Sequence, residues 1–201
     1  MATYNKKNFL AIMQALANAG FSGKDLLFAL AQSAHETKNY TDEKITSHNN
    51  PSGITFINNP DRQKNATKGR PLPENPKYSY AKFKTLNDWA KDYKRIIGKA
   101  ITSSSDTTSY ATALGAKGYF EVSPRYPKAI QHYAEGLDYH LKNIQRIIID
   151  NINTFTGLNL PAGIKLVDNS LPIAPSTKDS KNNTISPLLV AVLALIAFSF
   201  F

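Results

Sequence analysis

The sequence predicts a mainly α-helical domain with a short β segment, joined by a linker to an apolar C-terminal segment. Three observations predict this architecture. Apolar residues recur at spacings of three and four over most of the first 155 residues, as on the buried faces of amphipathic helices. Apolar residues make up 42% of the 201-residue chain, and its 10 Phe, 10 Tyr and 1 Trp favour a packed core over disorder. A polar, Pro-containing stretch and then an almost wholly apolar one follow the helical part.

The first two helices are predicted from apolar stripes and capping residues. The N-terminal segment has the pattern of an amphipathic helix ending near Gly20, rather than that of a secretory signal. Its stripe consists of Phe9, Met13, Leu16 and Ala17. Ser22 and Asp25 form a candidate capping box for a second helix. The stripe of that helix consists of Leu26, Leu27, Leu30 and Ala34.

Two shorter patterns predict helices in the second half of the domain. Thr85 and Asp88 form another candidate capping box, and the helix that follows is expected to end near Gly98. A shorter helix is expected over residues 109–117, closed by Gly118.

A long helix is expected to complete the domain. Ser123 is its candidate N-cap and Pro124 its first residue, a position where the missing N–H of proline costs nothing. Its stripe consists of Ile130, Tyr133, Leu137, Leu141, Ile144, Ile148, Ile152 and Phe155. Because this stripe is longer than a compact domain needs, we expect its end to form a stalk or a helix–helix seam through which the chain self-associates.

The segment from Thr37 to Pro76 is rich in Asn, Pro, Gly and Lys. A structureless loop of this length is uncommon in a compact domain, so the segment is either functional or contains a small hairpin. Residues 77–83, KYSYAKF, alternate apolar and polar side chains and predict one short strand.

The composition divides the chain into a domain at 1–155, a linker at 156–184 and a membrane-spanning helix at 185–201. The linker includes the small, polar sequence PIAPSTKDSKNNT. In the last 17 residues, Ser186 and Ser199 are the only polar side chains. This length lies at the lower limit for a transmembrane helix, and the segment is expected to anchor the chain in a membrane.

The net charge of +9 favours anionic partners such as nucleic acid, anionic lipid or acidic wall polymers. The basic residues are dispersed and no nucleic-acid motif is present, so specific nucleic-acid binding is not expected. The absence of cysteine excludes disulfides and thiol chemistry. The four histidines are scattered along the chain, and we expect no metal site and no cofactor.

Glu36 is the first candidate catalytic residue. It lies at the predicted C-terminal end of the second helix, at the edge of the apolar stripe. Partial burial and the negative end of the helix dipole both disfavour an anion there, so both are expected to raise the pKa of Glu36. A glutamic acid that stays protonated near neutral pH is what cleavage of a glycosidic bond requires as general acid. From position alone, a solvated glutamate at a frayed helix end explains the pattern at least as well.

The sequence NNPSGI follows the acid at residues 49–54. The amides of Asn49 and Asn50 suit the hydroxyl and N-acetyl groups of sugars, because an amide both donates and accepts hydrogen bonds. Gly53 adds a conformationally permissive position directly beside them. Asn-rich loops are also common as turns without a binding role.

Three aromatic residues, Tyr119, Phe120 and Tyr126, surround a tight turn that begins at a glycine. Aromatic side chains in a turn can stack on sugar rings. They can equally pack the loop against the core, and the sequence does not separate these interpretations.

Taken in order, these motifs resemble glycoside hydrolase family 73, the endo-β-N-acetylglucosaminidases that cut peptidoglycan, among them flagellar-rod hydrolases and bacterial autolysins. The resemblance spans roughly residues 10–141. Family members carry the catalytic Glu in a (Q)xxxET helix end, matched by Gln32, Glu36 and Thr37. The family's NNxFGI turn is matched by Asn49, Asn50, Gly53 and Ile54. Its GYATDPxY motif is matched loosely by Gly118, Tyr119, Pro124 and Tyr126.

The resemblance implies a lysozyme-like α fold with a small β-hairpin between Lys64 and Lys84. It implies that Glu36 is the catalytic acid and that the Asn turn, Tyr119 and Tyr126 bind substrate. Some members carry a second acid a few tens of residues after the first. Glu74 is the only Glu in that stretch and is the candidate base that activates water. The alternatives for this second role are Asp61, Glu43 and Glu121.

These inferences predict hydrolysis of the β-1,4 glycosidic bond after N-acetylglucosamine in peptidoglycan glycan strands. Two alternatives stay open. The helix end AHET also fits a lysozyme-type muramidase, a lytic transglycosylase or a chitinase. The chain can also be a non-catalytic structural protein of a virion membrane that kept the fold.

The charge pattern near the apolar span bears on localisation. Lys178 and Lys181 precede the span and no charge follows it, which places the domain on the side of synthesis. That side is a poor place for a wall hydrolase in a cell. A membrane-containing bacteriophage resolves the conflict, because an enzyme in the virion membrane meets peptidoglycan during entry or at lysis. A cellular tail-anchored protein and a phage-encoded lysis protein are the alternatives.

Overall fold

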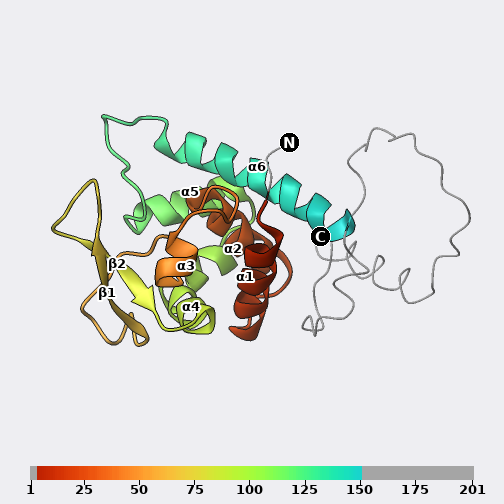
Figure 1. Ribbon diagram of the computed structural model, residues 1–201. Coiled ribbons are helices and arrows are strands. Elements are labelled where there is room, and N and C mark those ends of the chain that lie inside the picture. The colour runs from red at the N-terminus through yellow and green to blue at the C-terminus, as the bar shows by residue number, and fades with distance from the viewer. Residues whose placement is uncertain (1–3, 151–201) are drawn as a thin grey trace, which may run out of the picture.

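The computed structural model describes residues 4–150, which form a mainly helical α+β domain with one small antiparallel sheet (Figure 1). The mainly α prediction is confirmed for this part of the chain. In chain order the elements are α1 (Lys6–Asn18), α2 (Gly23–Glu36), α3 (Lys44–His48), β1 (Ala66–Pro71), β2 (Ser79–Phe83), α4 (Leu86–Thr102), α5 (Thr107–Ala116) and α6 (Ala129–Asp150). No helix within the described part is both long and apolar enough to cross a membrane. The predicted linker and span, 156–184 and 185–201, lie outside it.

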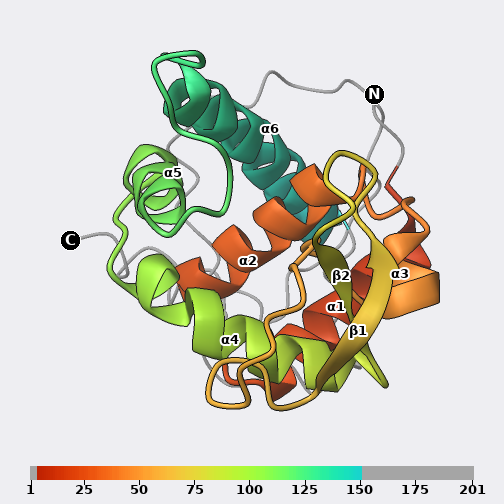
Figure 2. The same ribbon diagram turned by 90° about the vertical axis from the view of Figure 1, so that its left-hand side faces the viewer.

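The helix α2 forms the centre of the domain. Every residue from Leu26 to Ala34 is buried, as expected for a helix that is covered on all sides. Helices α1, α4 and α6 pack against it, and Figure 2 shows α2 running through the middle of the molecule. After α2, Tyr40 enters the core and its hydroxyl donates to the carbonyl of Leu30 at 2.8 Å. This return of the chain, through positive φ at Lys38, Asn39 and Tyr40, ends the helix at Glu36.

The N-terminus of α2 differs from its prediction. Ser22 precedes the helix in an extended conformation, but its side chain makes no capping hydrogen bond. The carboxylate of Asp25 instead accepts from the hydroxyl of Thr102 at 3.0 Å and so ties α2 to the end of α4. The predicted capping box at this helix is therefore wrong, although the position of the helix is confirmed.

The helix α4 begins as predicted and ends later. Thr85 accepts from the backbone N–H of Asp88 at 3.1 Å, as a capping residue does. The helix runs through Gly98 to Thr102, because Ala100 and Ile101 continue its buried face. Their burial outweighs the cost of an interior glycine, about 1 kcal/mol.

The last two helices have different boundaries from those predicted. The short helix α5 begins at Thr107, with a capping box formed by Asp106 and Ser109, and Gly118 follows its end as predicted. The long helix α6 begins at Ala129 rather than near Pro124. Tyr126 precedes Pro127, and the proline ring disfavours the helical conformation of the residue before it. The predicted part of this helix beyond 150 lies outside the described residues.

The hairpin predicted between Lys64 and Lys84 is confirmed. Strand β1 pairs with β2 antiparallel, with Ala66 opposite Phe83 and a register shift between Lys68 and Pro71. On the other edge of β2, the segment 54–56 adds backbone hydrogen bonds and a bridge between Thr55 and Tyr80. Figure 1 shows this hairpin and the segment between α5 and α6 on the same side of the molecule.

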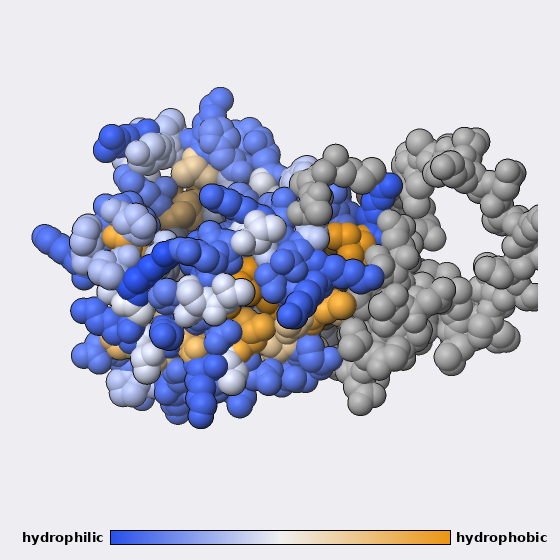
Figure 3. All heavy atoms as spheres, in the orientation of Figure 1, coloured by the Kyte–Doolittle hydropathy of each residue, from blue (hydrophilic) through white to orange (hydrophobic). Residues whose placement is uncertain are grey.

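The face seen in Figure 3 is mostly hydrophilic, as the dispersed basic residues predict. Hydrophobic side chains gather in the core beneath it, to which the described helices α1 to α6 and strand β2 all contribute. The large aromatic residues Trp89, Tyr93 and Tyr110 are fully buried there, and their polar atoms bond to buried partners.

Candidate active site

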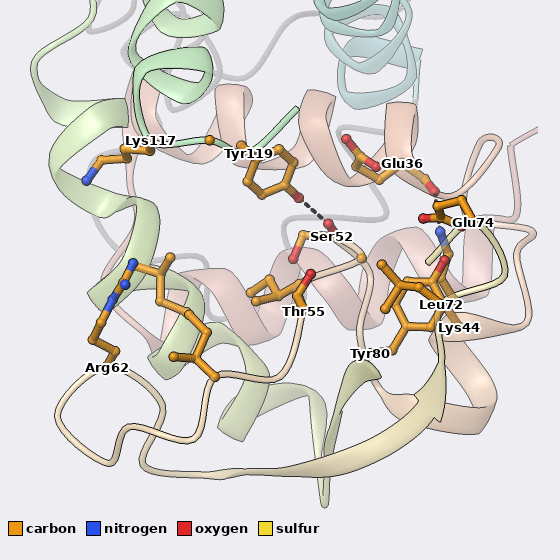
Figure 4. Close-up of a pocket in the computed structure, with 15 residues that line it drawn as sticks. Glu36, Lys44, Ser52, Thr55, Arg62, Leu72, Glu74, Tyr80, Lys117 and Tyr119 are labelled. Atoms are coloured by element: carbon orange, nitrogen blue, oxygen red, sulfur yellow. Dashed lines mark hydrogen bonds between the residues drawn. The ribbon is translucent and has the colours of Figure 1, made fainter. Parts of the chain in front are cut away.

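A cleft with a volume of about 370 Å³ opens where α2 ends. Its lining comes from the end of α2, the start of α3, the segment 52–57, the β1–β2 hairpin, α4 and the segment 117–119. Figure 4 shows Glu36 and Glu74 toward one end, Arg62 and Lys117 toward the other, and Tyr119 between them. Parts of the chain that are distant in sequence therefore meet around Glu36.

Glu36 is the last residue of α2, at the negative end of the helix dipole, and its side chain is half-buried. Burial raises the pKa of Glu36 above its usual range, while the hydrogen bond from Tyr133 and the charge of Lys44 act in the opposite direction. The expected rise in pKa is thus present, and its principal cause is burial.

The two carboxyl oxygens of Glu36 have different surroundings. Oε1 accepts a hydrogen bond from the hydroxyl of Tyr133, on α6, at 2.7 Å. Oε2 lies beside Gly53 on the cleft wall, 3.7 Å from the place where a Cβ at that position would stand. Gly53 has φ +64°, a conformation that favours glycine, so the chain keeps a side chain out of this space.

Lys44, the first residue of α3, lies on the same side of the cleft. Its ammonium donates to the main-chain carbonyl of Glu36 at 3.1 Å and lies 3.9 Å from the carboxylate of Asp42. It also stands 5.4 Å from the centre of the Tyr80 ring. The lysine therefore satisfies a carbonyl at the end of α2 and places a positive charge near the acid.

The paired asparagines support the turn and do not line the cleft. Asn49 adopts a left-handed conformation and its amide donates to the carbonyls of Phe83 and Lys84 at 3.1 Å each. Asn50 is fully buried; its amide donates to the carbonyls of Ile54 and Ala81 and accepts from the N–H of Ile54. The structure thus places neither amide where the predicted contact with substrate requires it. Both hold the backbone that carries Gly53.

Tyr119 lines the cleft, as its predicted binding role requires. Gly118, with φ +71°, turns the chain at the end of α5 and delivers this side chain. The Tyr119 hydroxyl donates to the carbonyl of Ser52, and the Ser52 hydroxyl accepts from the indole N–H of Trp89 at 2.8 Å. The tyrosine therefore also fastens the 49–54 turn to the opposite wall.

Gln32, one turn before Glu36, lies beneath the site in the core. Its carbonyl oxygen accepts from the hydroxyls of Tyr93, at 2.6 Å, and Tyr110. Its amide nitrogen is buried as well. This match to the family motif is thus part of a buried polar network rather than of the cleft wall.

Glu74 also lines the cleft, from the exposed loop between β1 and β2. Burial raises the pKa of Tyr80, and the charges of Glu74 and Glu36 add smaller contributions in the same direction. Figure 4 shows the two carboxylates and Tyr80 at the same end of the cleft. The other candidates for the second acid, Asp61, Glu43 and Glu121, are absent from the described lining. Glu43 instead pairs with Arg70.

The structure separates the other two aromatics of the turn from the cleft. Tyr126 is 46% exposed in the segment before α6 and does not line the cleft. Its ring faces the guanidinium of Arg125, 5.5 Å from the ring centre. Phe120 stacks on Tyr133, with 4.4 Å between ring centres, and so supports the donor of the Glu36 hydrogen bond.

Sequence reasoning missed Tyr133 and Lys44 as site residues. Tyr133 belongs to an apolar stripe and its spacing is that of a core residue, so only the packing of α6 on α2 reveals its contact with Glu36. One signal was available, because a tyrosine hydroxyl within a buried stripe needs a polar partner. Lys44 carried no such signal.

Among residues 4–150, no cluster of three or more His, Asp or Glu side chains is arranged to hold a metal ion.

Comparisons with known proteins add little to this geometry. No protein-family model and no curated protein matches the chain. A solved structure described as a type VI secretion system effector–immunity complex from Pseudomonas protegens contains a chain that aligns with 59% of this chain and 76% of its own length. The two are 19% identical with a TM-score of 0.44, a likeness that identifies neither a family nor an activity.

Proposed function

We propose that the chain is a glycoside hydrolase that cleaves the β-1,4 bond after N-acetylglucosamine in peptidoglycan, with Glu36 as the general acid. The environment of Glu36 carries this proposal. Its half-buried carboxyl has a raised pKa, one oxygen is held by Tyr133, and the other stands at the cleft wall. A carboxyl in this state can protonate the oxygen of a leaving sugar.

Each neighbouring group has a role in this reaction. As the proton leaves Glu36, the Tyr133 hydroxyl stabilises the carboxylate that forms. Glu74, on the hairpin loop, is the second carboxyl and activates the attacking water. Tyr119 provides an aromatic face for a sugar ring. Loss of the Glu36 proton to the leaving group is matched by transfer of a water proton to Glu74.

The proposal includes peptidoglycan as the substrate and a lysozyme-like fold for the domain. Glu36, Gly53 and Tyr119 come from three separate motifs that resemble glycoside hydrolase family 73, and all three line one cleft. The acid at the end of a central helix, with a small hairpin beside the cleft, is the arrangement that this resemblance implies.

Substitution of the acid tests the proposal. Glu36→Gln keeps the shape of the side chain and removes the proton, so hydrolysis of purified cell wall should fall about a thousandfold or more. Zymography and mass spectrometry of the digest measure this. The control is Glu43→Gln, which removes a carboxylate outside the cleft. If Glu36→Gln released fragments as fast as the wild type, Glu36 would not be the general acid.

The products separate the alternatives. Fragments ending in reducing N-acetylglucosamine agree with the proposed bond. Reducing N-acetylmuramic acid would identify a muramidase, and an anhydro-muramic end a lytic transglycosylase. A wild-type chain that releases no fragment from any cell wall would indicate a non-catalytic protein, such as a structural component of a virion membrane.

A further inference from the structure

Two basic side chains stand at the end of the cleft away from the acid. Arg62 belongs to the segment between α3 and β1, and Lys117 caps the C-terminus of α5. Figure 4 shows both beyond Tyr119, on the side opposite Glu36 and Glu74. Residues from two distant parts of the chain therefore place positive charge on the same part of the cleft.

Neither of these charges is neutralised within the described part of the chain. No carboxylate of residues 4–150 forms a salt bridge with Arg62 or Lys117. The third cation of the cleft, Lys44, has Asp42 and a carbonyl as partners. The basic end is thus the part of the cleft where a ligand's anion meets the least competition.

Both side chains are exposed, so a ligand bound in the cleft can reach them. Ile57 and Ile96 also line the cleft, and apolar walls strengthen an ionic contact once a ligand excludes water. An arginine can bind a carboxylate through two parallel hydrogen bonds, and a lysine adds a point charge. A neutral sugar polymer offers no group that needs such a pair.

We infer that Arg62 and Lys117 form an anion subsite that binds a carboxylate substituent of the glycan strand. The subsite makes the enzyme selective for acidic strands over neutral β-1,4 glucosamine polymers. This inference rests on the proposed function and deepens it, because peptidoglycan carries carboxylates on its lactyl peptides whereas chitin carries none. Since both residues lie away from Glu36, they act on substrate binding and not on the proton transfer.

Chemically matched substrates test the subsite. Soluble uncrosslinked peptidoglycan strands are compared with the same strands after their carboxylates are converted to neutral amides. The full-length wild-type chain should prefer the native strands by on the order of tenfold in kcat/KM, and 0.5 M salt should reduce this preference. In the double variant Arg62→Gln with Lys117→Gln, the ratio should fall toward one, mainly through a higher KM on native strands.

Two lysines of α4 supply the control. Lys91→Gln with Lys99→Gln removes the same amount of charge from exposed positions outside the cleft and should keep the preference. If that pair abolishes the preference equally, overall charge rather than the subsite is responsible. A preference that survives in the Arg62 and Lys117 variant, or that is absent from the wild type, overturns the inference.

Binding separates failure of the subsite from failure of the proposed function. The full-length Glu36→Gln variant, with and without the two cleft substitutions, is titrated calorimetrically with native and amidated strands. A preference for native strands that depends on Arg62 and Lys117 supports the subsite even if no hydrolysis is detected. Equal affinity for both strands, or binding to neither, contradicts the subsite even if Glu36 proves essential for hydrolysis.

Discussion

The hydrogen bond from Tyr133 sets how readily Glu36 gives up its proton. The bond is made to the carboxylate form and therefore lowers the pKa, against the larger effect of burial. Removing it should raise the pKa of Glu36 further. General-acid activity declines as pH rises through that pKa, so the decline should move to higher pH.

Tyr133→Phe tests this relation. We expect the alkaline limb of the pH–rate profile to shift upward in pH, and kcat to fall on the order of tenfold, because a hydrogen bond to the newly formed carboxylate is lost. The measurement is the rate on cell-wall fragments between pH 4 and pH 9. Tyr139→Phe, an exposed tyrosine of the same helix, is the control. If the alkaline limb of Tyr133→Phe stayed at the wild-type pH, the hydrogen bond from Tyr133 would not control the pKa of Glu36.

Because Asn50 is buried, we expect its substitution to affect the stability of the fold. The amide makes three hydrogen bonds to backbone groups that have no access to water. Asn50→Ala should therefore lower the free energy of unfolding by about 2–4 kcal/mol, since several buried polar groups lose their partners. Urea unfolding measures the change, with the exposed Asn58→Ala as control. Equal stability of the two variants would show that water replaces the amide.

At the level of elements, the packing of α6 on α2 brings Tyr133 to Glu36. Gly136 makes the close approach possible, because a Cβ at that position would lie 2.4 Å from the ring of His35. One turn further along α6, Nδ1 of His140 shares a hydrogen bond with the hydroxyl of Tyr4 at 2.8 Å. The two histidine rings lie 5.6 Å apart between the helices.

This packing predicts acid sensitivity. Burial, with a smaller contribution from His35, lowers the pKa of His140 from 6.5 to about 4, and burial lowers that of His35 as well. Between pH 6.5 and pH 4 the unfolded chain therefore binds more protons than the folded one, and stability falls as the pH is lowered through this window. At pH 5 the loss from His140 is about 1–2 kcal/mol.

The measurement is urea unfolding at pH 7 and pH 5. His140→Gln should reduce the difference between the two pH values, while His132→Gln, an exposed histidine of α6, should leave it unchanged. An equal difference in wild type and His140→Gln would assign the pH dependence to other groups.

The sequence predicted the elements better than it predicted their ends and contacts. The buried helix that carries Glu36 follows from the hydrophobic period, which is a local property. The hairpin that carries Glu74 was one of two interpretations of a long loop, and its position between Lys64 and Lys84 came from the family resemblance. The late start of α6 depends on Pro127, a local signal that the apolar stripe concealed. The contact of Tyr133 with Glu36 depends on how α6 packs on α2. The apolar pattern of either helix alone does not specify that packing.

The same limit applies within the site. Glu36, Gly53 and Tyr119 were predicted from local motifs and Glu74 from the family resemblance, and all four line the cleft. Asn50 was assigned to substrate because its amide suits sugars, but the same amide suits backbone groups equally well. Burial decides between the two uses, and burial is a property of the whole fold.

For the whole molecule, the predicted anchor at 185–201 can be tested directly. Its apolar composition should hold the full-length chain in the membrane fraction, whereas a chain ending at Lys178 should remain in the soluble fraction and keep its activity on cell wall. Ultracentrifugation after expression, followed by zymography, measures both. A full-length chain found in the soluble fraction without detergent would exclude the anchor and the proposed location in a virion membrane.

The position of Tyr133 on α6 also has a consequence for biosynthesis. Glu36 is made early, within α2, but the helix whose Tyr133 holds Oε1 is the last element of the described domain. A nascent chain therefore lacks the hydrogen bond to Oε1 until α6 has been synthesised and has docked on α2. The fold thus completes the surroundings of Glu36 only once α6 is in place, and under the proposed function a chain that lacks α6 should not cleave peptidoglycan.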